Sequence, residues 1–304
     1  MRSAVLFIIF KRPDTTRRVF ERIREAQPPR LYIAADGPRK DRSDEIEKCK
    51  AARKIVEVID WPCEVHRLYR DENLGCGKGV SSAITWFFEH EEQGIIIEDD
   101  ILPHIDFFRY CDEMLDRYKD DERIQEIGGH NTLYKGYSSD APYYLSNFQI
   151  IWGWASWKRV WDTYVYDINM IPREKLNEKF INRVPQKTCE YFMRIYDKMS
   201  SDGIDTWDYQ LYFNQILHNR YAIVPYVNMT RNIGFDSLDA AHTSGPNSKE
   251  LHHIERTPYP FVHPEVLFED KDADKIRINN SHFFMSSPIR RLCSKILSII
   301  KACL

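Results

Sequence analysis

The chain has few of the features that mark membrane-spanning or secreted proteins. No apolar run in its 304 residues approaches the roughly 20 positions that a transmembrane helix needs. The N-terminal apolar run, Ala4 to Phe10, is short and no cleavage pattern follows it, so we expect no signal peptide. The seven cysteines are scattered and none are spaced as CxxC, which argues against a disulfide framework or a structural zinc site. These absences predict a cytoplasmic protein.

Positive charge is not in excess either. Lys and Arg number 43 against 46 Asp and Glu, a net charge of −3, so the chain has no surplus of base to bind nucleic acid through counterion release. We therefore expect no nucleic-acid partner. Aromatic residues are plentiful at 13%, a composition that suits both carbohydrate-handling sites and ordinary cores.

Patterns typical of strands and helices alternate through the first hundred residues. Buried strands are expected at residues 4–10, 31–35, 64–69 and 94–98. The expected helices begin at Asp14 or Thr15, run from about 43 to 59, and pass through residues 80–88. Strand alternating with helix predicts an α/β fold, with a mostly parallel sheet flanked by helices. Further helices are expected at 107–118, 186–199 and 207–218, and a further strand at 222–227.

The central feature of the sequence is an apolar run that ends in acids. Residues 95–97 are three isoleucines, and Glu98, Asp99 and Asp100 follow them directly. In open α/β sheets, ligands bind at the carboxyl ends of the strands, which is where these acids would lie. Carboxylate oxygens suit Mg²⁺ or Mn²⁺, which usually share such a site with substrate phosphates. An acidic cap that only solubilises a loop is the alternative.

Other polar groups follow the neighbouring strands and would reach the same edge. Lys11 and Arg12 end the first strand, Asp36 ends the second, and the glycine-rich stretch 73–79 contains Lys78 and opens a helix. The stretch is not a Walker A motif, because Gly79 stands where Ser or Thr is needed, and no GxGxxG follows the first strand. Backbone amides at a helix start, together with Lys78, suit a diphosphate. Cations, carboxylates and a glycine loop at one edge predict a nucleotide-diphosphate site with a divalent cation.

The order of these motifs resembles the GT-A glycosyltransferases, closest to the N-acetylglucosaminyltransferase I type and related bacterial nucleotide-diphospho-sugar transferases. The resemblance implies that the acidic triplet serves as the DxD motif. Asp100 would then bind Mn²⁺ (or Mg²⁺) bridging the UDP phosphates, while Asp99 and Glu98 contact ribose and donor sugar. Arg12 and Asp36 would hold the nucleotide. The motifs are scattered over residues 4–243, and residues 244–304 are not covered.

The second half of the chain continues this resemblance. An aromatic segment, Trp152-Gly-Trp154, precedes the stretch Thr206-Trp-Asp-Tyr209, whose Asp208 matches the family's catalytic base. Only one Asp stands there, and Asp205 is a nearby competitor. Arg231-Asn-Ile-Gly-Phe235 leads to His242, a candidate for the diphosphate or metal or else a hydrogen-bonded loop histidine. Trp154 is a candidate for stacking on a sugar, although core packing explains a tryptophan there equally well.

The resemblance implies an inverting, metal-dependent transfer of a sugar from a UDP-sugar to a hydroxyl of a glycan or glycolipid. UDP-N-acetylglucosamine is the favoured donor. The rival enzyme class is a sugar-1-phosphate nucleotidyltransferase, whose signature usually places glycines and lysines after the first strand. Lys11-Arg-Pro-Asp14 lacks those glycines. The alternative that is not an enzyme is a peripheral membrane module whose nucleotide site is no longer functional.

We divide the chain into a GT-A domain at 1–285, with a nucleotide-binding half at 1–125 and an acceptor half at 126–285, and a C-terminal helix at 286–304. Apolar residues recur at helical spacing in 286–304, with basic residues between them. Such a helix either lies on an anionic membrane surface or docks on the domain's own core. The membrane reading predicts a lipid-linked glycan acceptor at the inner face of a bacterial membrane, as in polysaccharide biosynthesis.

Overall fold

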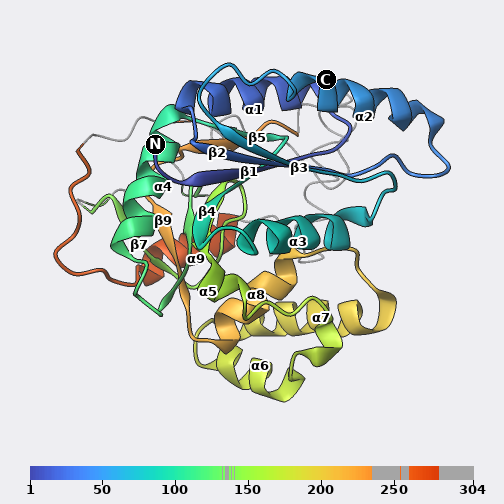
Figure 1. Cartoon of the computed structure of the whole chain (residues 1–304). Coiled ribbons are helices and arrows are strands. Elements are labelled where there is room, and N and C mark those ends of the chain that lie inside the picture. Colours follow the sequence, from blue (N-terminus) through green and yellow to red (C-terminus); the bar gives the residue numbers. More distant parts are fainter. Residues whose placement is uncertain are drawn as a thin grey trace, which may run out of the picture.

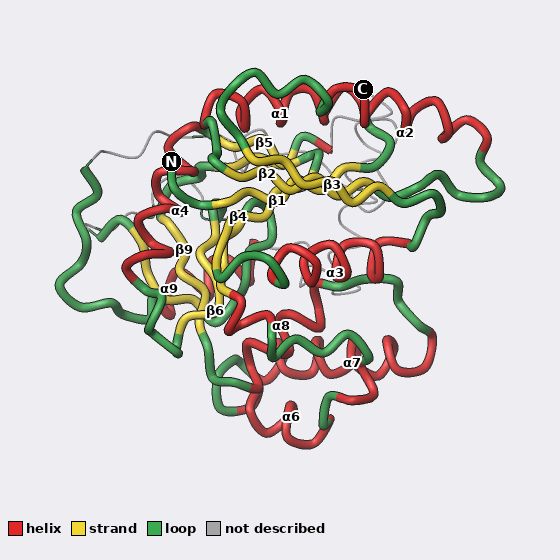
Figure 2. Tube along the Cα trace, viewed as in Figure 1, coloured by secondary structure: helices red, strands yellow, loops and turns green. Residues whose placement is uncertain are grey.

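The computed structural model of the chain describes residues 1–131, 133, 137, 139, 141–234, 254 and 260–280. An eight-stranded sheet forms the centre, in the order β3-β2-β1-β4-β8-β6-β9-β7 (Figures 1 and 2). Its strands are β1 (Ala4–Ile9), β2 (Arg30–Ala35), β3 (Glu64–Tyr69), β4 (Gln93–Glu98), β6 (Ile124–Gly128), β7 (Tyr143–Ser146), β8 (Trp154–Trp157) and β9 (Tyr221–Pro225). A separate ribbon pairs β5 (Ile101–Pro103) with β10 (Thr230–Asn232).

Helices cover both faces of the sheet and extend below it (Figure 1). In that view α1 and α2 lie above the strands and α3 lies below them. The helices are α1 (Pro13–Ala26), α2 (Ser43–Ile55), α3 (Gly75–Phe88), α4 (Ile105–Arg117), α5 (Lys158–Trp161), α6 (Arg173–Ile181), α7 (Gln186–Asp202), α8 (Asp208–Leu217) and α9 (Lys271–Asn280), with a 3₁₀ turn at η1 (Ile168–Met170).

The first four strands of the sheet run parallel, with β1 between β2 and β4. Alternate residues of β1 face opposite sides, because side chains of a strand point to the two faces in turn. Val5 and Phe7 pack in the core beneath α1 and α4, and Leu6 packs in the core above α3. Burial on both faces explains why these strands read as continuous apolar runs.

Strand β8, like β6 and β7, is a part of the sheet that the sequence did not predict. It runs antiparallel to both neighbours, β4 and β6, and its residues Trp154 to Trp157 are all buried. A central strand is buried on both faces, so apolar and polar residues do not alternate along it. The sequence pattern therefore indicates only an aromatic stretch at this segment.

A helical layer lies on the lower side of the sheet in Figure 1, formed by α6, α7 and α8. Its core is aromatic: Phe180 stacks on Phe192 with ring centroids 5.6 Å apart, and Tyr212 contacts both rings. The first residue of α8 is Asp208, so the packing of this layer positions the candidate catalytic base.

The expected fold class is confirmed: the chain has an α/β fold whose mostly parallel sheet is flanked by helices. Two details differ. Helix α1 begins at Pro13 with Arg12 at its N-cap, which is earlier than Asp14 or Thr15, because proline suits the first helical position. The boundary drawn at residue 125 falls inside β6, so both halves contribute to one sheet.

The described part of the chain contains no helix that is both long and apolar enough to cross a membrane. Its five cysteines are free thiols. The C-terminal helix expected at 286–304 lies outside the described residues.

Candidate active site at the carboxyl edge of the sheet

The acidic triplet lies at the carboxyl end of β4, as the sequence predicts. Glu98 is the last residue of the strand, and Asp99 and Asp100 form the turn that leads into β5. Asp99 is 2% exposed and Asp100 9% exposed, so both carboxylates are held inside the protein. A solubilising cap would leave them in water, so the structure disfavours that alternative.

Arg12 bridges two of these carboxylates from the end of β1. Its Nη2 lies 2.8 Å from Asp99 Oδ1, and its Nη1 lies 2.7 Å from Asp100 Oδ2. The backbone N–H of Phe10 donates to Asp99 Oδ2 at 3.1 Å. Burial alone would lower the pKa of Arg12, but the charges of Asp99 and Asp100 outweigh it and raise that pKa. The guanidinium is therefore a fixed positive charge within the site.

One arginine does not neutralise the triplet. Burial, and next the charge of Asp100, raise the pKa of Glu98 to about 8. Burial also raises the pKa of Asp99 to about 6, although Arg12 opposes the shift. Burial is the largest cause of both shifts, and a bound cation would favour the ionised form of each carboxyl group.

The ribbon of β5 and β10 closes the site on one side. The backbone N–H of Ile233 donates to the carbonyl oxygen of Asp100 at 2.7 Å. A Cβ on Gly234 would lie 2.5 Å from Asp100 Oδ2 and 3.0 Å from Arg12 Nη1, so only glycine allows this approach. The start of the segment 231–235 thus lies against the triplet, whereas His242 lies outside the described residues.

Asp208 is brought into electrostatic range of the triplet by α8. Its charge contributes to the raised pKa of Glu98, although burial is the larger cause. The hydroxyl of Thr206 donates to Asp208 Oδ1, and Gln149 Nε2 donates to the backbone carbonyl of Asp208 at 2.7 Å. The carboxylate is therefore oriented by its own turn.

Asp36 and Lys11 each bind another residue of the protein. Asp36 Oδ2 accepts from the N–H of Leu74 at 2.9 Å, and burial raises the pKa of Asp36. Lys11 Nζ forms a 2.8 Å ion pair with the buried carboxylate of Glu45. The ammonium of Lys11 is thus engaged by α2, and its expected contact with a nucleotide stays a prediction.

The glycine stretch holds a carboxylate of the protein itself. Asp205 Oδ2 accepts from the N–H of Cys76 at 2.9 Å, and Asp205 Oδ1 accepts from the N–H of Gly77 at 2.8 Å. These amides belong to the first turn of α3, where the sequence predicts a diphosphate. Lys78, in the same turn, is exposed. In this structure the anion at the helix start is Asp205.

Trp154 requires a correction. We expected it to stack on a sugar, but its side chain is 1% exposed in the core between β8 and α3. It stacks on Trp207, with ring centroids 5.9 Å apart and planes inclined by 20°. Because neither face is open to a ligand, Trp154 acts by supporting the turn that carries Asp208.

The carboxylates of the triplet suit Mn²⁺ or Mg²⁺ only if water and substrate phosphates complete the set of ligands. No group of three or more His, Cys, Asp or Glu side chains within the described ranges is arranged to hold a metal ion by itself. Magnesium-type ions are usually held by one or two carboxylates, with water and substrate phosphates as the remaining ligands. The carboxylate of Asp100 suits that arrangement, whereas both oxygens of Asp99 already bind Arg12 and the N–H of Phe10.

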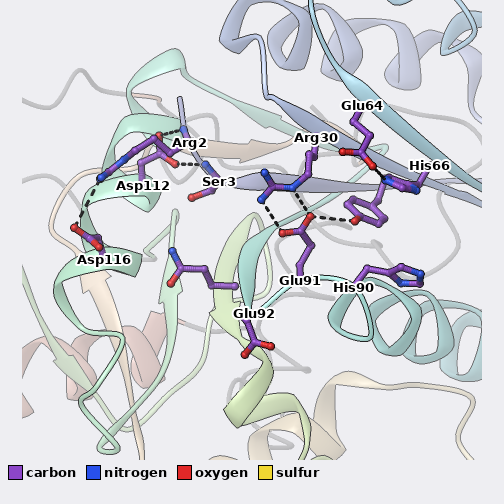
Figure 3. A pocket seen from close by; sticks show the side chains of 12 residues that line it. Arg2, Ser3, Arg30, Glu64, His66, His90, Glu91, Glu92, Asp112 and Asp116 are labelled. Atoms are coloured by element: carbon purple, nitrogen blue, oxygen red, sulfur yellow. Dashed lines mark hydrogen bonds and ion pairs between the residues drawn. The ribbon is translucent and has the colours of Figure 1, made fainter.

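A separate cavity of about 670 Å³ opens at the opposite, amino edge of the sheet (Figure 3). Several of its charged groups are paired with each other. Arg30 forms two hydrogen bonds with Glu91, at 2.5 and 2.8 Å, and His66 lies 2.9 Å from Glu64. Because ligands of open α/β sheets bind at the carboxyl edge, we place the active site at the triplet and assign no ligand to this cavity.

No family model and no curated protein matches the sequence. Solved structures similar to this chain include HddC from Yersinia pseudotuberculosis, at 12% identity over 53% of this chain and 80% of that one, with a TM-score of 0.33. A UDP-glucose pyrophosphorylase complexed with UDP-glucose is 12% identical over 54% and 79%, with a TM-score of 0.34. S. aureus TarS 1–349 is 8% identical over 77% and 61%, with a TM-score of 0.41. At this level of likeness, the assignment of function depends on the chain's own residues.

Proposed function

We propose that this protein is a metal-dependent, inverting glycosyltransferase that moves a sugar from a UDP-sugar to a hydroxyl group of a glycan or lipid-linked glycan. One observation carries the proposal: a buried carboxylate pair, bridged by Arg12 at the carboxyl edge of the sheet, lies within electrostatic range of a separate carboxylate, Asp208. The pair serves donor binding, and Asp208 serves the acceptor.

The donor side requires positive charge next to the diphosphate. Mn²⁺ or Mg²⁺ held by Asp100 would neutralise charge on the leaving UDP. Arg12 is the resident cation, and its position at the start of α1 allows it to bind the diphosphate beside the same carboxylates. Glu98, the last residue of β4, would contact the donor sugar.

The acceptor side requires a base. As the acceptor oxygen attacks C1 of the donor sugar, its proton passes to the carboxylate of Asp208, and the bond from C1 to the UDP oxygen breaks with its electron pair going to UDP. Attack opposite to the leaving group inverts the configuration at C1. The hydrogen bond from Thr206 holds the Asp208 carboxylate in one orientation for this step.

UDP-N-acetylglucosamine is our proposed donor, and a lipid-linked glycan our proposed acceptor. The acceptor proposal depends on residues 286–304 reaching a membrane surface. A chain lacking 286–304 is expected to sediment less with anionic vesicles than the full chain. Equal sedimentation of the two chains would remove the basis for a lipid-linked acceptor.

The first test is calorimetric titration with UDP and UDP-sugars, each with and without Mn²⁺. We expect UDP binding that requires the metal in the wild type and is lost in Asp100→Ala. Binding of a nucleoside triphosphate with turnover of a sugar 1-phosphate would instead identify a nucleotidyltransferase. Absence of any nucleotide binding would refute both enzyme classes.

The second test separates binding from chemistry. Asp208→Asn removes the base but keeps the acceptor oxygen for Thr206, so we expect unchanged UDP affinity and turnover lower by roughly 10²- to 10⁴-fold. Full activity in Asp208→Asn would show that another group takes the proton.

A further inference from the structure

Asp205 connects the two sides of the proposed site. It lies in the loop between α7 and α8, only three positions before Asp208. Both of its carboxylate oxygens accept hydrogen bonds from backbone N–H groups of α3, a helix more than a hundred residues earlier in the chain. Figure 1 shows α3 above this loop, with the sheet on the far side of the helix. The contact therefore ties the acceptor side to the nucleotide side.

The glycines of the stretch 73–79 are fitted to this carboxylate. A Cβ on Gly75 would lie 2.5 Å from Asp205 Oδ2, and a Cβ on Gly77 would lie 2.8 Å from Asp205 Oδ1. Gly75 also has a φ of +81°, a backbone conformation that favours glycine. Helix α3 has no side-chain cap from its own N-cap residue, Leu74, and no acid in its first turn. Asp205 supplies that missing acceptor for the helix start.

Other contacts of the turn involve Trp207 and Asp208, and Trp207 packs in the core that α3 also lines. Trp207 is 2% exposed and stacks on Trp154, and Gln149 holds the backbone carbonyl of Asp208. These contacts fix the turn to β8 and to the loop before it. The hydrogen bonds of Asp205 attach the turn directly to the backbone of the first turn of α3.

The thiol of Cys76 lies close to carboxylates of both the donor side and the acceptor side of the proposed site. Burial is the main cause that raises the pKa of its thiol to about 12, and four carboxylates on both sides of the site add to the shift. They are Glu98, Asp208, Asp205 and Asp100. A movement of the turn relative to α3 would change the distance between Asp208 and the triplet, across which the sugar must pass.

We propose that Asp205 is a positioning residue, which fixes Asp208 relative to the donor site by clamping the turn 205–208 to the first turn of α3. This role depends on the proposed transferase function. A displacement of about 1 Å in a catalytic group can lower a rate by roughly 10²-fold, because the reacting atoms no longer meet in an attack geometry. The clamp touches neither substrate, so donor affinity should not depend on it.

The test compares Asp205→Asn and Gly77→Ala with Asp202→Asn. An Asn side chain keeps one acceptor oxygen and loses the other. A Cβ at position 77 would lie 2.8 Å from Asp205 Oδ1 and 2.8 Å from the backbone oxygen of Thr206, so it pushes the whole turn away from α3. Asp202, at the exposed end of α7, is the matched control. We expect kcat to fall by roughly 10- to 100-fold in the first two variants, with the Kd for UDP and Mn²⁺ within about 2-fold of wild type. The control should retain its kcat.

A second readout does not need turnover. Alkylation of Cys76 by iodoacetamide, followed by mass spectrometry, should be faster in Asp205→Asn than in wild type, because one of the charges that raise the thiol's pKa is lost and the helix turn is released. A thermal melt confirms that each variant is folded.

The outcomes separate the two proposals. An active wild type, together with Asp205→Asn at full kcat or with UDP affinity lost as much as kcat, would overturn the positioning role alone. A wild type that neither binds UDP nor transfers sugar would overturn the proposed function and this role with it.

Discussion

Removal of the Arg12 charge should destabilise the protein in a pH-dependent manner. Arg12→Met keeps much of the aliphatic length and removes the guanidinium that bridges Asp99 and Asp100 at 2.8 and 2.7 Å. Breaking a fully buried pair costs about 3–5 kcal/mol, and breaking an exposed one about 0–1 kcal/mol. The Arg12 side chain is 22% exposed, between these limits. We therefore expect a loss of about 2–3 kcal/mol at pH 8.

The loss should be smaller at low pH. Arg12 lowers the pKa of both Glu98 and Asp99, so without it both groups hold their protons to higher pH in the folded state. A folded state that binds more protons loses stability as pH rises. Since the pKa values of Asp99 and Glu98 are about 6 and about 8, the difference between variant and wild type should grow between pH 5 and pH 8. Near pH 5 we expect a loss of about 1 kcal/mol.

Urea unfolding followed by tryptophan fluorescence, with divalent cations chelated, measures this effect. Arg24→Met is the matched control, since Arg24 lies on the same helix and pairs with Asp60 at the exposed surface. It should cost at most about 0.5 kcal/mol at either pH. A loss in Arg12→Met that is equal at pH 5 and pH 8, or no larger than in the control, would refute the electrostatic account of the site.

Three further outcomes follow from the packing of the sheet. Trp154→Phe should lower stability by about 1–2 kcal/mol while UDP affinity stays unchanged, because Trp154 packs on Trp207 in the core; weaker UDP binding without a loss of stability would contradict this. Gly94→Ala should cost about 1–3 kcal/mol in the same unfolding assay, because its methyl group would collide with the buried ring of Phe87; a neutral effect would show that the ring can move. Burial raises the pKa of Glu126 to about 8, so its contribution to stability is present at low pH and lost as pH rises toward 8. Glu126→Gln should therefore flatten the fall in stability between pH 5 and 8, and an unchanged slope would show that Glu126 does not cause it.

The sequence predicted the elements whose signals are local. The β-branched run 95–97 and the acids after it identified β4 and the edge of the sheet, and the apolar run 4–10 identified β1. These patterns depend only on neighbouring residues. The positions of Glu98, Asp99, Asp100 and Arg12 in one cluster followed from the rule that parallel strands share a carboxyl edge.

The sequence could not predict contacts between distant segments. The glycine stretch 73–79 suggested a diphosphate, but Asp205 occupies the amides of Cys76 and Gly77, and no local pattern links positions 128 and 129 residues apart. Cys76, in the same stretch, gave no signal at all, since its surroundings come from four separate carboxylates. Lys11 likewise pairs with Glu45 across 34 positions. Such partners depend on how the helices pack, which the periodicity of each helix does not determine.

The insertion of β8 into the middle of the sheet has a consequence for synthesis on the ribosome. Strand β4 ends at residue 98, but its outer partner is made only when residues 154–157 emerge, after β6 and β7. Until then the isoleucine run of β4 is an unpaired edge, which is a template for pairing with another chain. A nascent chain or an expressed fragment that stops between residues 99 and 153 therefore carries an aggregation-prone edge. The strands on the two sides of β8 join into one sheet only after β8 has been made.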